Sequence, residues 1–117
     1  KLDDAPLARI VAYKLLHLNR FDEAITLFEK AKSIRPEEPQ SERDLALALI
    51  ARADDTMRVA LRLSSTNAVE DRATGAVADY NRALSLLHNV VMKDWDRFAG
   101  IEMIALTEAG RAIAHAK

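Results

Sequence analysis

Three histidines are the side chains of this sequence best suited to metal binding or proton transfer. They are His17, His88 and His115, separated by long stretches of chain. A zinc-binding helix brings two histidines one turn apart with a glutamate beside them, as in His-Glu-x-x-His, and none of the three has such neighbours. We therefore interpret them as surface or packed helical residues, and the sequence predicts no metal site.

Three pairs of acids invite a general acid–base interpretation: Glu37 with Glu38, Asp54 with Asp55, and Asp94 with Asp96. Neighbouring acids on a helix point to different sides, and all three pairs stand at predicted helix ends or turns. Helix capping is therefore the simpler interpretation. The serines lack the glycines of a nucleophile elbow, and the chain has no glycine-rich phosphate loop. We expect no catalytic residue, no cofactor and no enzyme activity.

The composition favours one helical domain. The chain has 117 residues, half of them hydrophobic, with only three glycines and three prolines, so turn signals are too few for many short strands. Net charge is −1 without a basic stripe, which argues against nucleic-acid binding. No apolar run approaches the ~20 residues of a membrane span. Because the chain starts at Lys1 rather than methionine, we expect it to be part of a longer protein.

Apolar spacing of three and four residues predicts five amphipathic helices. Their expected ranges are about 5–18, 22–34, 39–63, 76–92 and 97–116. Asn19 suits the left-handed end of the first helix, and Ser41 to Asp44 resembles a capping box that starts the third. The third helix either continues past Asp54 or breaks there. Residues 64–67 are the clearest loop, and 70–75 are ambiguous.

The predicted helices have well-defined apolar stripes. These are Leu7, Ile10, Val11, Leu15 and Leu18 in the first; Ala24, Ile25, Phe28, Ala31 and Ile34 in the second; Val77, Tyr80, Ala83, Leu84, Leu87 and Val91 in the fourth; and Phe98, Ile101, Ala105, Ala109 and Ala112 in the fifth. Such stripes are typical of helices that face a shared core.

The stripe of the first helix recurs in the third. Val11, Ala12 and Leu15 are each followed 34 residues later by a matching residue: Leu45, Ala46 and Leu49. A 34-residue period of helix–turn–helix units is the signature of the tetratricopeptide repeat. The second helix adds Phe21, Ala24, Phe28, Ala31 and Pro36, which resemble the aromatic, alanine and proline positions of that repeat. Residues 5–38 thus resemble one repeat, departing from it at Ala8, Ala12 and Asn19.

The second unit, residues 39–95, is interrupted. Tyr80, Ala83 and Leu87 match Phe21, Ala24 and Phe28 at a spacing of 59 residues, which is 25 more than the repeat period. An insertion is therefore predicted between 50 and 77, and it either extends the third helix or folds over the groove. The expected fold is all-α: a tetratricopeptide-like stack of about five helices with an extra helix at 97–116. An unrelated helical bundle is the alternative.

A second resemblance is carried by RPEEPQSERDLALAL (35–49) and VVMKDWDRFAGIEMIAL (90–106). These stretches are similar to the tetratricopeptide segment of large bacterial proteins that also carry inter-alpha-trypsin-inhibitor-type and von Willebrand A-type domains. This resemblance implies an exported or envelope-associated parent protein with an adhesive or scaffolding context.

The tetratricopeptide resemblance also implies a binding surface, because members of that family bind ligands along the concave face of their first helices. Carried over by position, that face comprises Arg9, Tyr13, His17, Arg43, Leu47 and Ile50. Tyr13 and Leu47 stand where the family's carboxylate clamp has asparagine, so this face is not that clamp. Its arginines and aliphatic groups suit a peptide with acidic and apolar side chains. Trp95 is either an interface anchor or a seal between two helices.

Three functions follow as hypotheses. The first is a protein–protein interaction module or scaffold segment that binds a protein or peptide through this face. The second is a structural connector or oligomerisation block without a ligand of its own, which self-associates or docks onto neighbouring domains. The third is a helical-bundle enzyme or phosphotransfer domain, which needs convergent polar residues that the sequence does not offer.

Overall fold

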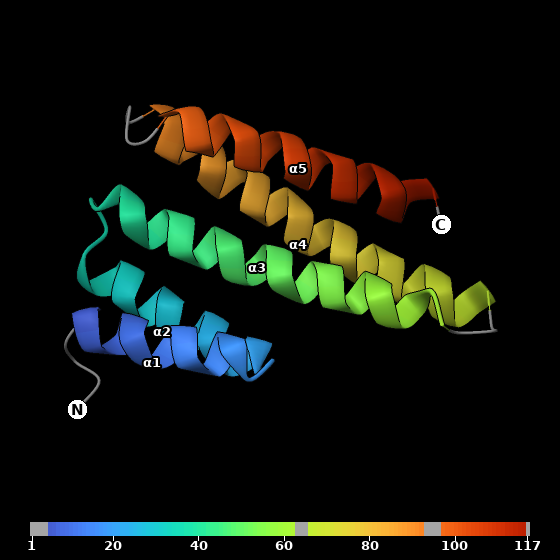
Figure 1. Cartoon of the computed structure of the whole chain (residues 1–117), viewed down its shortest axis with the longest axis horizontal. Coiled ribbons are helices and arrows are strands. Elements are labelled where there is room, and N and C mark those ends of the chain that lie inside the picture. Colours follow the sequence, from blue (N-terminus) through green and yellow to red (C-terminus); the bar gives the residue numbers. More distant parts are fainter. Residues whose placement is uncertain (1–4, 63–65, 93–96, 117) are drawn as a thin grey trace.

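The computed structural model describes residues 5–62, 66–92 and 97–116, and within them the chain is all-α, as the sequence predicts. The described helices are α1 (Ala5–His17), α2 (Phe21–Ile34), α3 (Pro39–Ala60), α4 (Thr66–Met92) and α5 (Arg97–Ala116). Each helix packs against the next along the chain (Figure 1). α1 and α5 therefore lie at opposite edges of the stack.

α1 and α2 form a short hairpin whose turn the sequence predicts correctly. α1 ends at His17, and Asn19 takes the left-handed conformation with φ 59°. Asparagine tolerates this region better than most residues, so it can reverse the chain without glycine. α2 then begins at Phe21 and runs to Ile34, before the prolines that prevent its continuation.

α3 is one continuous helix of 22 residues that passes Asp54 and Asp55 without a break. The capping interpretation of this acid pair is therefore wrong. The capping box predicted at Ser41–Asp44 is wrong as well, because α3 begins at Pro39 with Glu38 as its N-cap. Proline fits the first turn, where its missing N–H has no helical partner to lose.

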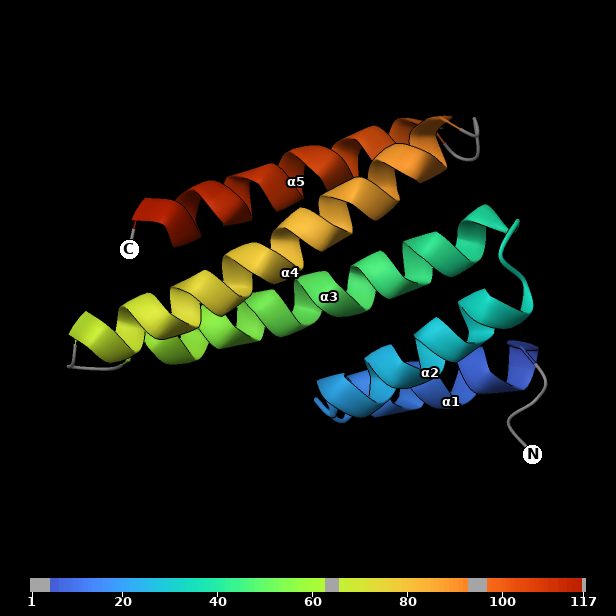
Figure 2. The same ribbon diagram turned by 180° about the vertical axis from the view of Figure 1, so that it is seen from behind.

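The two longest helices, α3 and α4, include the described residues of the segment in which an insertion is predicted. α3 has 22 residues and α4 has 27, whereas α1 and α2 have 13 and 14. α4 begins at Thr66, so residues 70–75 are helical. Of the loop predicted at 64–67, residues 66 and 67 are helical, and residues 64 and 65 lie outside the described residues. α3 and α4 extend past the end of the α1–α2 hairpin rather than over it (Figures 1 and 2).

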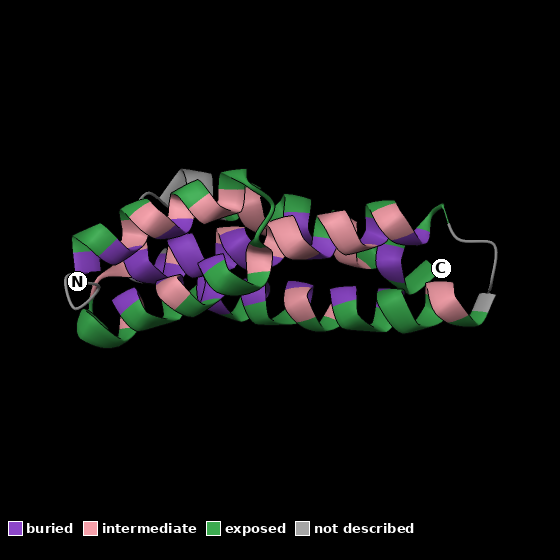
Figure 3. Cartoon of the chain, turned by 90° about the horizontal axis from the view of Figure 1, so that it is seen from below, coloured by how far each residue is buried: buried purple, intermediate pink, exposed green. Residues whose placement is uncertain are grey.

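Two larger hydrophobic cores lie along the stack, between helices whose outer sides are exposed (Figure 3), and a small cluster of Ala5, Ala8 and Ala31 joins α1 to α2. The first core joins α1–α4 and consists of Ala12, Ala24, Ile25, Phe28, Leu45, Ala46, Ala48, Leu49, Ala83, Leu86 and Leu87. The second core lies in the extension, between α3, α4 and α5. It consists of Ala53, Met57, Ala73, Ala76, Tyr80 and Ala114.

Arg52 lies between the two cores and joins three helices. Its Nε and Nη2 donate to the two carboxylate oxygens of Asp79 on α4 at 2.8 and 2.7 Å. Its Nη1 donates to Asp22 on α2 at 2.8 Å. The hydrogen bonds and charge of Asp79, with a smaller share from Asp22, raise the pKa of the Arg52 guanidinium despite partial burial. This fork fixes the end of the hairpin against the long helices.

The two edge helices bury small residues and expose large ones. α1 buries Ala5, Ala8 and Ala12, while Ile10 and Leu18 of its apolar stripe are 67% and 58% exposed. Among the residues of α5 whose side chains are described, Thr107 and Ala114 are buried, whereas Ile101, Ala105, Ala109 and Ala112 of the predicted stripe are exposed. The apolar stripes of both edge helices therefore turn toward solvent.

Among the described residues, none of the helices combines the length and the apolar character needed to cross a bilayer.

Candidate partner-binding face

The six residues of the predicted binding face form two rows on α1 and α3. We call them the inner face: Arg9, Tyr13, His17, Arg43, Leu47 and Ile50. The α1 row has a spacing of four residues and the α3 row spacings of four and three, so each row follows one side of its helix. His17 is exposed and the other five are half-buried. All six therefore keep surface that a partner can touch, and the extension of α3 and α4 does not cover them.

Asp44 connects the two rows. Its carboxylate is fully buried, and it accepts hydrogen bonds from the Arg9 guanidinium and the Tyr13 hydroxyl across the α1–α3 junction. A buried carboxylate needs such partners because losing water costs several kcal/mol. Sequence reasoning assigned Asp44 to a helix cap and missed this role. Its place beside Leu45, on the buried side of α3, is the signal that could have found it.

Two arginines of the inner face lie beside the buried Asp44 carboxylate. Arg43 places its Nη2 3.9 Å from Asp44 Oδ1, and Arg9 lies on the other side of the same carboxylate. Burial alone would lower the pKa of the Arg9 guanidinium, but the hydrogen bond and charge of Asp44 raise it above its usual value. Two guanidinium groups therefore lie beside one carboxylate.

Tyr13 is held in place at both ends of its ring. Its hydroxyl is bonded to Asp44, and the ring meets Phe28 edge to face with centroids 5.0 Å apart. Burial first, and then the hydrogen bond to Asp44, raise the pKa of the Tyr13 phenol above its ordinary value. Tyr13 is thus a rigid, neutral aromatic surface between the arginines and the first core.

The aliphatic members of the inner face border the cores. Ile50 packs against both cores, so it marks the point on α3 where one core gives way to the other. Leu47 lies one turn away on the same helix and is half-buried. Trp95, the possible interface anchor, lies outside the described residues.

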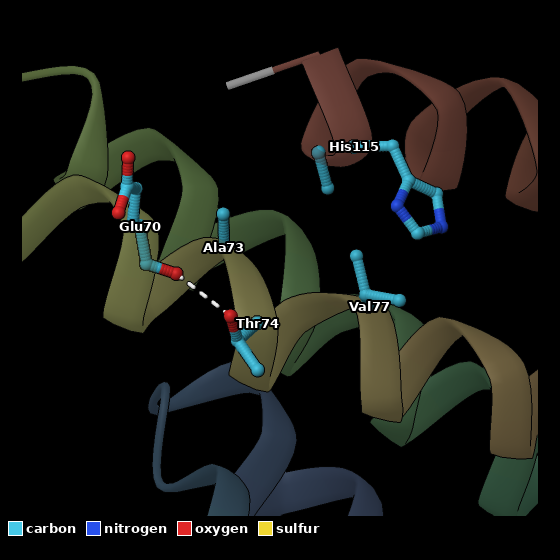
Figure 4. Close-up of a pocket in the computed structure, with 6 residues that line it drawn as sticks. Glu70, Ala73, Thr74, Val77 and His115 are labelled. Carbon is cyan, nitrogen blue, oxygen red and sulfur yellow. Dashed lines mark hydrogen bonds between the residues drawn. The ribbon is translucent and has the colours of Figure 1, made fainter.

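The clearest alternative site is a hollow of about 460 Å³ between α4 and the end of α5. It contains Glu70, Thr74, Val77 and His115, and in Figure 4 the imidazole lies over Val77 while the glutamate carboxylate stands at the other end. The Thr74 hydroxyl donates to the Glu70 backbone carbonyl at 2.9 Å. The hydroxyl is therefore engaged by the backbone of its own helix, and the residues that line the hollow form no nucleophile–base pair.

The other acids and the histidines that the structure describes do not converge. Asp54 accepts a hydrogen bond from Tyr80, and Asp55 accepts one from Arg58. His17, His88 and His115 are exposed on three different helices. In the described part of the chain, no group of three or more histidine, aspartate and glutamate side chains is placed to hold a metal ion.

The inner face therefore combines two cations, one fixed aromatic ring and two aliphatic side chains on one side of the stack. This set of groups can bind a carboxylate and apolar side chains of a partner. Comparisons of this chain with protein-family models, with curated proteins and with solved structures find no match.

Proposed function

We propose that this protein is a non-catalytic binding module that holds an acidic, partly apolar segment of a partner protein on its inner face. The observation that carries this proposal is the cluster around Asp44. Arg9 and Tyr13 are hydrogen-bonded to one buried carboxylate, Arg43 lies 3.9 Å from it, and all three side chains retain exposed surface. Preordered cations bind carboxylates with little loss of side-chain freedom.

The proposal includes a tetratricopeptide-like architecture. Packing at the matched positions supports it: Ala24 and Ala83 are fully buried, and so are Phe28 and Leu87. The small residues of each pair allow close helix approach, and the large ones fill the space beside them. The tetratricopeptide-like architecture that we propose assigns α1 and α3 to the binding face.

A titration of the folded chain with acidic peptides tests this function. The probe is a labelled peptide pool in which aspartate or glutamate alternates with leucine, and the comparison pool carries lysine in place of the acids. We expect the double variant Arg9→Gln, Arg43→Gln to bind the acidic pool at least about tenfold more weakly, because charge-assisted hydrogen bonds contribute ~1.5–3 kcal/mol each.

The matched control is Arg62→Gln with Arg72→Gln, which removes two exposed arginines outside the inner face. Circular dichroism checks that each variant stays helical. Equal affinity of the wild type and the Arg9/Arg43 variant for the acidic pool, or equal binding of both pools, would refute the inner-face function.

A structural connector is the second candidate function, and the edge helices favour it. Both α1 and α5 turn large apolar side chains outward, as a block that is covered by other protein would. This function requires no ligand on the inner face.

A further inference from the structure

The outward side of α5 is an apolar surface with no cover. We call it the α5 face: Ile101, Ala105, Leu106, Ala109, Ala112 and Ile113. Its three large side chains are 53%, 70% and 56% exposed in chain order. Spacings of three and four residues keep the whole set on one side of the helix. Met103 and Ile104, on another side of α5, pack against the first core, so α5 has apolar residues on its exposed side as well as on its packed side. An exposed apolar surface of this kind is typical of an interface.

A second apolar surface lies at the opposite edge of the stack. We call it the α1–α2 groove, a hollow of about 550 Å³ lined by Val11, Leu15, Asp22, Glu23, Thr26 and Leu27. Its floor is aliphatic. Its two acids already have partners, because Asp22 is bonded to Arg52 and Glu23 to Arg20 at 2.6 and 2.8 Å.

The next unit of the stack shows what kind of element fits this groove. Leu45 and Leu49 follow Val11 and Leu15 by 34 residues, and both are fully buried in the first core. They are buried because the apolar side of α2 lies against α3. The matching positions on α1 remain open, so the groove has the shape and chemistry to accept an amphipathic helix.

The charged residues near the two apolar surfaces suit α5 as the helix that occupies the α1–α2 groove. Glu108 is exposed at the edge of the α5 face, and Glu102 is exposed within it, one turn before Ala105 and Leu106. Lys14 and Lys30 are exposed one turn along from the residues that line the groove. Acidic residues on one apolar surface and basic residues beside the other favour this pairing over others and guide the approach of the two surfaces.

We propose that copies of this chain associate head to tail, with the α5 face of one copy in the α1–α2 groove of the next. This contact covers both apolar surfaces at once, whereas a two-fold α5–α5 dimer leaves the groove open. Heterologous contacts of this kind continue into rings or open chains. The inference deepens the connector function and does not depend on ligand binding at the inner face.

Sedimentation velocity on blocked variants of the 117-residue chain tests the contact. Leu106→Asp with Ile113→Asp blocks the α5 face, and Lys14→Glu with Thr26→Arg blocks the groove. All four positions are exposed, so we expect both variants to remain helical by circular dichroism. Ala78→Asp on α4 is the matched control, because it places a charge at an exposed position outside both surfaces.

We expect the average mass of the wild type and of Ala78→Asp to rise with concentration. Each blocked variant alone stays monomeric, with self-association weakened at least about tenfold. An equal mixture of the two blocked variants gives a heterodimer and nothing larger, because only one α5 face and one groove remain to pair.

Three outcomes overturn the proposal. One is a wild type that remains monomeric over the whole concentration range. Another is a groove-blocked variant that still dimerises, which would indicate α5–α5 pairing. The last is a mixture that contains monomers only. Peptide binding is measured with the Arg9/Arg43 variant, so failure here leaves the inner-face function standing, and failure there leaves this contact standing.

Discussion

The two cores of this molecule are built from different residues. The first buries Phe28 and four leucines among its alanines, whereas the second buries four alanines around Met57 and Tyr80. Burial of large side chains is the main favourable term in folding, so the first core contributes more stability for each helical turn. The second core holds long helices together at close range with little apolar volume.

Close approach makes the second core depend on how Tyr80 fits. A Cβ placed on Gly110 of α5 would lie 3.1 Å from Tyr80 Cζ, so the tyrosine ring lies directly against the α5 backbone. The Tyr80 hydroxyl donates to Asp54 on α3. The Tyr80 side chain on α4 thus contacts both neighbouring helices, α3 and α5. The packing of the second core therefore depends on how this one side chain fits.

The largest difference between the cores is expected from truncating one large residue in each. We predict that Phe28→Ala lowers the free energy of unfolding by about 3–5 kcal/mol, because it leaves a cavity among residues that are buried on all sides. Met57→Ala is expected near 2 kcal/mol, the low end for such truncations, since it lies beside small neighbours. Urea unfolding followed by circular dichroism measures both. Equal losses would contradict the ranking of the cores.

Removing one hydroxyl from each core tests their polar contacts. Tyr13→Phe leaves the fully buried Asp44 carboxylate short of one donor, so we predict a loss of about 1–3 kcal/mol. Tyr80→Phe affects Asp54, which is exposed to water and can replace the bond, so a loss of about 0.5–1 kcal/mol is expected. The same unfolding assay compares them, and a larger loss for Tyr80→Phe would reverse the assignment.

The sequence predicts those parts of the fold that depend on local signals. The helical class, the reversal at Asn19 and the two helices of the first hairpin follow from periodicity and turn chemistry. The start of α4 does not, because residues 66–75 contain few apolar side chains. That segment is helical where Ala73 and Ala76 pack into the second core, and this depends on the extended half of α3.

The site and the edge helices depend on contacts that lie far apart in the chain. From the sequence alone, Asp44 is interpreted as part of a helix cap. Its real partners, Arg9 and Tyr13, lie more than 30 residues earlier in the chain and contact it only in the folded structure. The stripes of α1 and α5 are real amphipathic patterns. Which side of a helix is covered depends on its neighbours: α1 has its alanine side covered, whereas α5 is covered at Thr107 and Ala114 and leaves Ala105, Ala109 and Ala112 exposed.

Adding one methyl group to each of two glycines gives effects of opposite sign. We predict that Gly110→Ala destabilises by about 1 kcal/mol, because overpacking against Tyr80 costs more than the helix propensity of alanine returns. Gly75→Ala meets nothing within 4 Å and is expected to stabilise by about 0.5–1 kcal/mol. Thermal unfolding checks both signs. A stabilising Gly110→Ala would show that the α4–α5 contact is looser than the second core requires.

Alkaline pH is expected to lower the stability of both cores, because ionisation of their tyrosines favours the unfolded state. This loss of stability is smallest near neutral pH. Burial, and then the hydrogen bond to Asp54, raise the pKa of Tyr80. Burial and the hydrogen bond to Asp44 raise the pKa of Tyr13 in the same way. An unfolded tyrosine ionises near pH 10, while the folded phenol keeps its proton. The unfolded state therefore binds fewer protons above pH ~10, so stability is fully present below that pH and is lost as pH rises toward the folded pKa.

The chain has two tyrosines, so Tyr13→Phe and Tyr80→Phe each leave one phenol to follow by tyrosinate absorbance. We expect the remaining tyrosine in each variant to ionise above pH 10 while the chain is helical, and near pH 10 in urea. We expect Tyr80 to ionise at a higher pH than Tyr13 if the second core excludes water around Tyr80 as closely as the burial of that residue indicates. A Tyr80 phenol that titrates normally in the folded chain would mean that α5 moves away from α4, which would make the second core the part of the molecule that opens first.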